Sequence, residues 1–205
     1  ILFLPEKILI EETISKCNQL DFKVEGKNLK DKKFYQVIKA GTQSISCSLG
    51  IPDNIEFNRI IINPSKSSSF AEVEQLLLQI FGPIILDAKV YRIDFTVDIF
   101  EEYNNVLRGL DIKYKTANVQ FIGNSIRTGL LVGVGHDKLS IYNKAKKEKV
   151  KSPWTRIERQ LTGPKVPIKR FGDLRYGLSK ILEFNPMNVV TLYNIELLEL
   201  PNLTG

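Results

Sequence analysis

Alternating apolar and polar positions mark the clearest strand of the chain, which we predict over residues 88–100. Apolar side chains at every second position are expected to face a core: Tyr91, Ile93, Phe95, Val97 and Ile99. The polar positions between them face the other side: Arg92, Asp94, Thr96 and Asp98. A strand with one apolar face and one polar face is typical of an antiparallel sheet.

Apolar residues at a spacing of three and four predict a helix over 70–81. Ser69 precedes it as an N-cap, and Glu72 three positions later completes a capping box. Gly82 and Pro83 are expected to end the helix. The signals at both ends agree with the periodicity between them.

The remaining pattern predicts short strands and a few helices. Strands are expected over 34–39, 44–49, 57–63, 117–122, 128–134 and 139–144, with helices over 101–110 and 168–184. Residues 189–200 fit either a helix or a strand. Without repeats or a long linker, the sequence predicts one α+β domain over 1–205, with a mainly antiparallel sheet flanked by helices.

A second strand-like pair lies between Leu139 and Leu161, around a lysine-rich loop. Period-2 geometry places Tyr142 and Lys144 on one face of the first segment. On the second segment four residues are expected to share a face: Trp154, Arg156, Glu158 and Gln160. Ile157 and Leu161 point the opposite way. Paired strands would thus hold a tyrosine, a lysine, an arginine and a glutamate.

Positive charge is concentrated around this pair. The chain has a net charge of +6, yet residues 138–170 hold eleven Lys and Arg against two acids, and the remainder is net negative. Such a basic run favours binding to a polyanion such as nucleic acid. The alternative is that it forms a solvated face.

Other compositional signals narrow the class of protein. Cys17 and Cys47 lack metal-ligand spacing and suggest reduced thiols in a cytoplasmic protein. His136, the single histidine, excludes a site built from several histidines of this chain. No apolar run reaches the length of a membrane span, so no membrane partner is expected. Because the chain begins with Ile1 rather than methionine, we expect a trimmed product.

Three acids on the predicted polar faces are candidate ligands for a hard divalent cation: Asp94, Asp98 and Glu158. Asp94 and Asp98 lie four residues apart, about 13 Å at the rise of a strand. One ion therefore cannot bind both directly on a straight strand, but either could join Glu158. The alternative is that the aspartates form a solvent face, paired with Arg92 and Arg156.

Tyr142 also has a chemical interpretation. A tyrosine hydroxyl can attack a phosphodiester and hold the product covalently when nearby charge favours its deprotonation. Lys144 and a metal would both supply such charge. The alternative is a strand tyrosine with a polar tip. Trp154 is expected as a core anchor, with base stacking as its alternative.

Three motifs occur in an order that resembles the replication initiation factor family. They are Ile62-Asn-Pro-Ser65 before a helix, Tyr91-Arg-Ile-Asp-Phe-Thr-Val-Asp98, and Ile141-Tyr-Asn-Lys144 followed by Thr155-Arg-Ile-Glu-Arg159. The family includes rolling-circle plasmid Rep proteins and, more distantly, filamentous phage replication endonucleases. The resemblance covers 57–163, with 164–205 as a helical C-terminal extension, and it implies a Rep nuclease (HUH-like) fold.

The resemblance implies a site-specific DNA nickase and strand transferase that requires Mg²⁺ or Mn²⁺. The nucleophile falls on Tyr142, with Lys144 beside it, and the metal carboxylates fall on Glu158 and on Asp94 or Asp98. Candidate DNA contacts are Arg92, Lys146, Lys147, Lys149, Lys151, Arg156 and Arg159. Tyr91, Tyr114 and Tyr176 lie in or near the matching region as other tyrosines. A paired-histidine metal site, common in tyrosine nucleases, is incompatible with one histidine.

The implied substrate is the replication origin of a plasmid, phage or related mobile element, single-stranded or in a hairpin at the nick. Helicase and polymerase are further implied partners, and a homodimer is an expected assembly. Two alternatives stay open. One is a non-catalytic origin-binding initiator or regulator, and the other is a transposase or relaxase relative that uses the same chemistry on a different DNA site.

Overall fold

The computed structural model describes residues 1–29, 32–39, 45–49, 56–64, 69–113, 120–121, 129–133 and 135–192. The chain divides into two compact units. Unit 1 comprises Ile1–Tyr91 with Ile168–Gly177, and unit 2 comprises Arg92–Pro167 with Leu178–Gly205. The expectation of a single domain stays a prediction, because this division does not show whether either unit folds alone.

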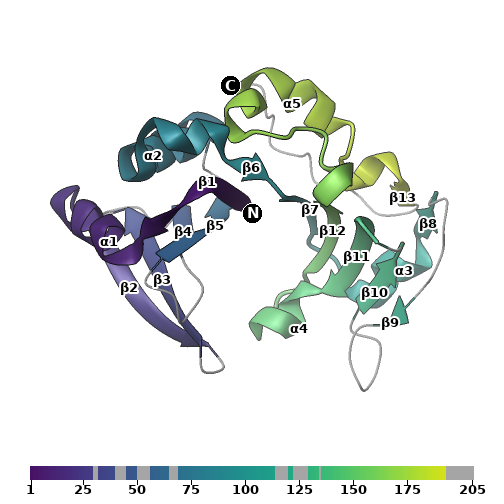
Figure 1. Cartoon of the computed structure of the whole chain (residues 1–205). Helices are drawn as coiled ribbons and strands as arrows, with labels where there is room; N and C mark the ends of the chain where they lie inside the picture. Colours follow the sequence, from purple (N-terminus) through teal and green to yellow (C-terminus); the bar gives the residue numbers. More distant parts are fainter. Residues whose placement is uncertain are drawn as a thin grey trace. The chain divides into compact units, whose positions relative to one another are not determined.

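Unit 1 contains an antiparallel six-stranded sheet in the order β2-β3-β4-β5-β1-β6 (Figure 1). The strands are β1 (Leu2–Leu9), β2 (Phe22–Leu29), β3 (Lys32–Lys39), β4 (Ile45–Leu49), β5 (Glu56–Pro64) and β6 (Lys89–Val90). The helical segments are α1 (Ile10–Gln19), α2 (Phe70–Phe81), and the 3₁₀ turns η1 (Gly82–Asp87) and η3 (Phe171–Asp173). The predicted pairing of 34–39 with 44–49 is confirmed by β3 and β4.

The predicted start and end of α2 are confirmed. The Ser69 Oγ accepts a hydrogen bond from the Glu72 backbone amide at 3.2 Å, and Glu72 Oε2 accepts one from the Ser69 amide at 2.7 Å. This reciprocal pair satisfies two of the amides that a helix N-terminus leaves without an intrahelical partner. Gly82 follows the helix at a φ of 72°, which a glycine adopts without strain.

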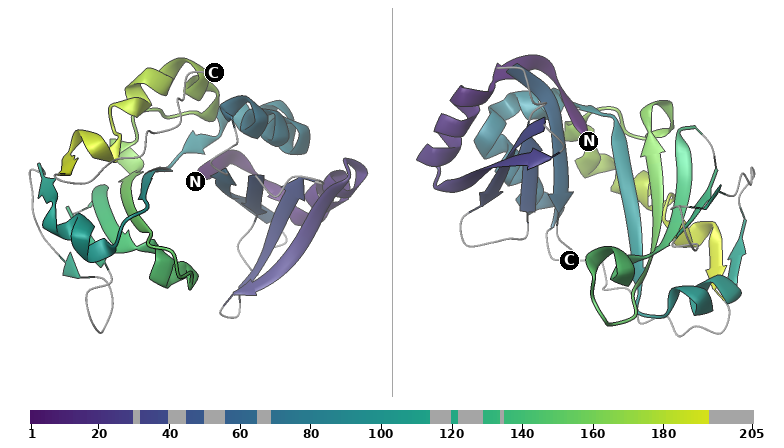
Figure 2. Two further views of the ribbon diagram at one scale, coloured as in Figure 1. Left: turned by 180° about the vertical axis from the view of Figure 1, so that it is seen from behind. Right: turned by 90° about the horizontal axis from the view of Figure 1, so that it is seen from below.

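Unit 2 contains an antiparallel five-stranded sheet in the order β7-β12-β11-β10-β9 (Figure 2). Its strands are β7 (Arg92–Ile99), β9 (Gln120–Phe121), β10 (Gly129–Val132), β11 (Asp137–Asn143) and β12 (Thr155–Thr162). A two-stranded sheet joins β8 (Leu110–Ile112) to β13 (Val190–Leu192). The helical segments are α3 (Tyr103–Arg108), α4 (Lys144–Glu148), and the turns η2 (Gly163–Lys165) and η4 (Pro186–Asn188).

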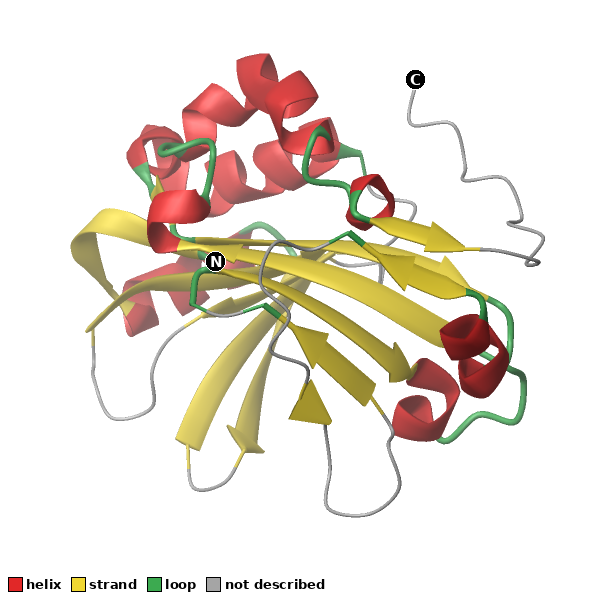
Figure 3. Cartoon of the chain, turned by 90° about the vertical axis from the view of Figure 1, so that its right-hand side faces the viewer, coloured by secondary structure: helices red, strands yellow, loops and turns green. Residues whose placement is uncertain are grey.

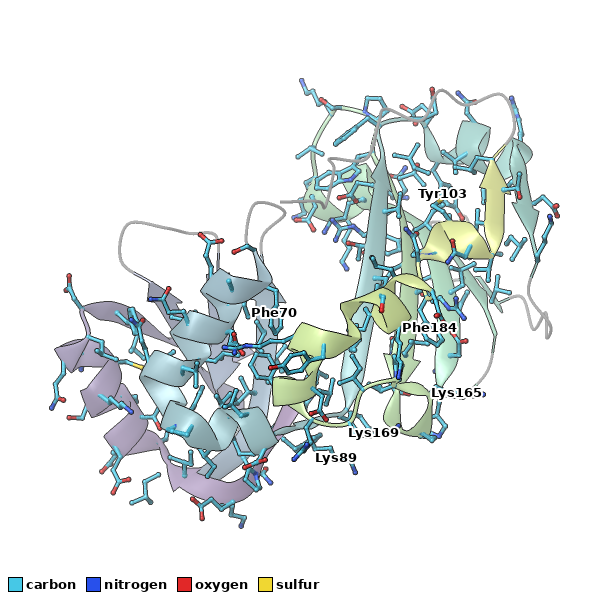
Figure 4. The ribbon with its side chains drawn as sticks, turned by 90° about the horizontal axis from the view of Figure 1, so that it is seen from above. Phe70, Lys89, Tyr103, Lys165, Lys169 and Phe184 are labelled. Carbon is cyan, nitrogen blue, oxygen red and sulfur yellow. The ribbon has the colours of Figure 1, made fainter. Side chains whose placement is uncertain are left out.

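The apolar face of this sheet forms the core of unit 2. Side chains from β7, β10, β11, β12, α3 and β13 meet there: Val97, Ile99, Tyr103, Val106, Val132, Leu139, Ile141, Ile157 and Val190. Tyr103 is labelled in Figure 4. Along β12 burial alternates strictly, with Ile157 and Leu161 fully buried and Arg156 and Glu158 partly exposed. Burial of the apolar side chains therefore determines which side chains lie on the opposite, polar face of the sheet.

The α+β class with antiparallel sheets flanked by helices is confirmed (Figure 3). Several predicted boundaries were wrong. The strand predicted over 88–100 is two strands: β6 joins the sheet of unit 1, and β7 joins that of unit 2. Tyr91 separates them; its amide donates to the Ile1 carbonyl, and its side chain is 39% exposed rather than in the core.

The C-terminal region also differs in its bounds. The helix predicted over 168–184 is the shorter α5 (Leu174–Leu182), preceded by η3. Val189 follows η4, residues 190–192 are the strand β13, and residues 193–200 of the predicted element lie outside the described residues. Among the helices that the structure describes, none has the length and apolar character to cross a membrane.

Candidate functional site

The polar face of β7, β12 and β11 brings most of the predicted site residues together. Register places Arg156 of β12 directly between Asp98 of β7 and Tyr142 of β11. One step along the sheet, Glu158 lies between Thr96 and Ser140. Directly paired residues have Cβ atoms about 5 Å apart, so their side chains can interact. The predicted shared face of Arg156 and Glu158 is confirmed.

Tyr142 and Glu158 contact each other across this face. The Tyr142 hydroxyl donates a hydrogen bond to Glu158 Oε2 at 3.3 Å. Burial raises the pKa of Tyr142, the negative charge of Glu158 raises it further, and Arg156 lowers it. The hydroxyl is thus held protonated beside a carboxylate that could accept its proton.

Arg156 joins the tyrosine to Asp98. Its Nε and Nη2 donate to the two Asp98 oxygens at 2.7 and 2.9 Å. The hydrogen bond to Asp98 raises the pKa of Arg156, and burial partly offsets that effect. Asp98 has a side chain that is only 3% exposed, so the guanidinium is its counter-charge. The pair fixes Arg156 opposite Tyr142.

Arg92 makes the equivalent pair with Asp94. Its Nε lies 2.7 Å from Asp94 Oδ1, and its Nη2 lies 3.9 Å from Glu158 Oε1. The hydrogen bond to Asp94 is the main cause that raises the pKa of Arg92. Arg92 therefore supplies the positive charge between Asp94 and Glu158. The alternative interpretation of the two aspartates, a solvent face paired with arginines, is right about the pairing, but the Asp98 side chain is buried rather than exposed to solvent.

The predicted metal carboxylates are not gathered in one cluster. Within the described residues, no three His, Cys, Asp or Glu side chains gather as ligands. Glu158 opposes Thr96 and is only diagonal to Asp94 and Asp98, at about 7–8 Å in such a ladder. An arginine already neutralises each aspartate. A cation would have to displace Arg92 from between Asp94 and Glu158.

Lys144 does not lie on the strand with Tyr142, so that prediction was wrong. Strand β11 ends at Asn143, whose side chain accepts a hydrogen bond from the Lys146 amide at 2.8 Å and caps α4. Lys144 begins this helix and pairs with Glu148 one turn later. Its Nζ lies 5.4 Å from the centroid of the Trp154 ring.

Four predicted DNA contacts are exposed on α4 and the following loop: Lys146, Lys147, Lys149 and Lys151. Figures 1 and 2 show α4 at the end of β11, beside the start of β12. The Lys147 Nζ lies 5.0 Å from the centroid of the Tyr142 ring. This lysine, rather than Lys144, is the ammonium group beside the candidate nucleophile.

Arg159 lies on the opposite face of β12 from Arg156. It is 9% exposed and pairs with Asp137, with Nε–Oδ1 and Nη2–Oδ2 distances of 3.0 and 2.8 Å. Its guanidinium lies 5.1 Å from the ring centroid of Phe184, which is labelled in Figure 4. The structure therefore does not bring Arg159 to the Tyr142 face.

The other candidate residues have different surroundings. Tyr91 packs edge-on against Phe3 at 5.4 Å, Tyr176 is exposed on α5, and Tyr114 lies outside the described residues. His136 Nδ1 lies 3.1 Å from Thr162 Oγ1 in a turn. Cys17 is buried, and burial raises the pKa of its thiol to about 11. Among the candidate tyrosines that the structure describes, Tyr142 is thus the one with both a carboxylate and cations beside it.

Sequence comparison gives no relatives: no family model matches the chain, and no curated protein matches it. Among solved structures, the chain is similar to one described as "Structure of Rolling Circle Replication Initiator Protein from Geobacillus stearothermophilus". The two share 15% identity with a TM-score of 0.39, over 93% of this chain and 80% of the other. A likeness at this level carries no argument about function, which has to be argued from the chain's own residues.

Proposed function

We propose that this protein is a rolling-circle replication initiator that nicks DNA with Tyr142 as its nucleophile. The observation that carries the proposal is the 3.3 Å hydrogen bond from the Tyr142 hydroxyl to Glu158, on a face where Arg92 and Arg156 pair with the two aspartates. The three ordered motifs that resemble the replication initiation factor family place the same tyrosine as nucleophile. Geometry and motif order thus support one residue independently.

The chemistry needs a proton acceptor because burial and Glu158 raise the pKa of Tyr142. As the tyrosine oxygen attacks the phosphorus of a phosphodiester, its proton passes to Glu158 Oε2. The bond from phosphorus to the 3′ oxygen breaks, and that oxygen leaves with a proton from water. The products are a 5′-phosphotyrosine link and a free 3′ hydroxyl.

Two cations beside Tyr142 are suited to the charge that develops on the phosphate. Arg156 is held by Asp98 through Nε and Nη2 and lies opposite Tyr142 in the sheet, so a phosphate at Tyr142 would meet its guanidinium. Lys147, over the tyrosine ring, adds a mobile ammonium. Charge that is already in place at the reacting atom costs no reorganisation in the transition state.

The lysines of α4 and its loop would bind the DNA backbone on either side of the nick. The four exposed ammonium groups follow Tyr142 closely in sequence, and phosphate contacts of this kind position a nucleic acid without reading its sequence. The dependence on Mg²⁺ or Mn²⁺ stays a prediction, as do the homodimer, the helicase and polymerase partners, and the cytoplasmic location.

Nicking is tested with single-stranded oligonucleotides of random sequence that carry a 3′ fluorophore. The pool is incubated with the protein, in parallel with Mn²⁺ and with EDTA, and resolved on a denaturing gel. The proposal expects a fluorescent band at the mass of protein plus DNA, since the tyrosine retains the labelled 3′ part. The metal prediction expects that band only with Mn²⁺.

A second candidate function is an origin-binding initiator or regulator that does not cut DNA. Two observations favour it. Both aspartates are already paired with arginines, and the raised pKa of Tyr142 makes its hydroxyl harder to deprotonate for attack. Retention of the labelled pool on a native gel, with no labelled band under denaturing conditions, would support this second function and contradict the first.

A further inference from the structure

Two aromatic side chains stack at the end of the polar face of unit 2. Phe100 directly follows β7, and Trp154 directly precedes β12. Their ring centroids are 6.3 Å apart, with an angle of 29° between the planes. Phe100 is 57% exposed, whereas Trp154 is partly buried. The tryptophan therefore supports a phenylalanine that keeps much of its surface in solvent.

Two cations lie beside the tryptophan of this pair. The Lys144 Nζ and the Arg156 Cζ lie 5.4 and 5.6 Å from the centroid of the Trp154 ring. Arg156 is also the residue opposite Tyr142 in the sheet. The exposed lysines of α4 and its loop lie between Lys144 and Trp154 in the chain. A single exposed aromatic residue is ordinary, but an aromatic stack among fixed cations matches both parts of a nucleotide, the planar base and the phosphate.

We infer that Phe100, supported by Trp154, is a stacking platform for an unpaired nucleobase next to the phosphate that Tyr142 would attack. The base has to be unpaired because bases inside a duplex already cover both of their faces. A peptide of acidic residues alone would satisfy the lysines but offers no planar ring for Phe100. The inference rests on the proposed function for its placement beside Tyr142, while the stacking itself requires only that the protein binds single strands.

The test measures binding of single-stranded oligothymidylate of about 12 nucleotides, within the range of one binding site. Phe100→Ala is compared with Phe100→Leu, which keeps an apolar side chain without a ring. Tyr176→Ala removes an exposed aromatic ring on α5 and is the matched control. A series of probes with one abasic position each finds the stacked base. Thermal melting checks that every variant is folded.

We expect Phe100→Ala to weaken binding of the single strand on the order of tenfold, with Phe100→Leu nearly as weak and Tyr176→Ala unchanged. One abasic position should weaken binding to the wild type and have no further effect on Phe100→Ala. Fluorescence of Trp154, the only tryptophan, should change with the intact probe more than with that abasic probe.

Equal binding by Phe100→Ala and wild type overturns the inference, and so does an abasic series without a preferred position. Competition by an oligoglutamate of equal charge, as strong in Phe100→Ala as in wild type, would indicate an acidic peptide instead. These outcomes are distinct from failure of the proposed function. Stacking without a covalent adduct rejects the nickase alone, and an adduct without stacking rejects the platform alone.

Discussion

Arg156 and Asp98 form a bidentate ion pair in which the aspartate is almost completely buried, with N–O distances of 2.7 and 2.9 Å. Arg156→Ala would leave the Asp98 carboxylate without its counter-charge. We expect a loss of about 3 kcal/mol in the free energy of unfolding, measured by urea denaturation. The double variant Arg156→Gln with Asp98→Asn should recover part of it, because both charges are removed together.

The control for this loss is Arg170, whose pairs with Asp173 and Asp87 are exposed to solvent. Arg170→Ala should leave the urea midpoint unchanged, since exposed ion pairs contribute little to stability. Equal midpoints for Arg156→Ala and the wild type would show that Asp98 is not held by this arginine.

Glu158→Gln tests the carboxylate as the proton acceptor. The amide keeps the size of the side chain and can still accept a hydrogen bond from Tyr142, but it cannot take the proton. We expect the rate of adduct formation to fall by about 10²–10⁴, while binding of the same oligonucleotides on a native gel changes little. An unchanged adduct rate would remove Glu158 from the reaction.

The raised pKa of Tyr142 predicts a specific dependence of stability on pH. The folded protein holds the tyrosine proton more tightly than the unfolded chain does. The resulting stabilisation is complete below the ordinary pKa of tyrosine, about 10, and is lost as the pH rises through the higher pKa of the folded state. Wild type should therefore lose stability at alkaline pH, above that ordinary pKa, more steeply than Tyr142→Phe. Parallel curves would contradict the raised pKa.

The lysines of α4 and its loop predict how DNA binding depends on salt. Replacing Lys146, Lys149 and Lys151 by alanine should make the slope of log K against log salt shallower, by about 0.7 for each phosphate of a single strand that is no longer neutralised. Lys147 is left in place because it touches Tyr142. Alanine at Lys16, Lys89 and Lys180, which are all exposed, is the charge-matched control and should keep the slope. A slope unchanged by the triple variant would place the DNA elsewhere.

Local signals in the sequence were sufficient for several elements. The capping box of Ser69 and Glu72 and the alternation along β12 depend on neighbouring residues, so their geometry could be predicted. The same alternation places Arg159 on the side of Ile157 and Leu161, where it is buried. Its position in the alternation therefore predicts a buried arginine, although its charge suggested a DNA contact.

The wrong predictions concern interactions that a short stretch of sequence shows poorly or not at all. Asn143 caps α4, and the Lys144–Glu148 spacing of four residues was a readable sign of a helix that the strand pattern obscured. At the break, the Tyr91 amide donates a hydrogen bond to Ile1, which is distant in the chain, and Arg159 pairs with Asp137 on another strand. Phe100 was missed as well, since its stacking on Trp154 joins residues far apart in the chain.

The measurement that tests the central claim most directly is the site of the covalent link. Adduct from the random oligonucleotide pool would be digested with protease and nuclease, and the modified peptide identified by mass spectrometry. The account predicts a nucleotide on Tyr142, and no adduct from Tyr142→Phe although that variant still binds the pool. A nucleotide on any other tyrosine, or an undiminished adduct from Tyr142→Phe, would contradict it.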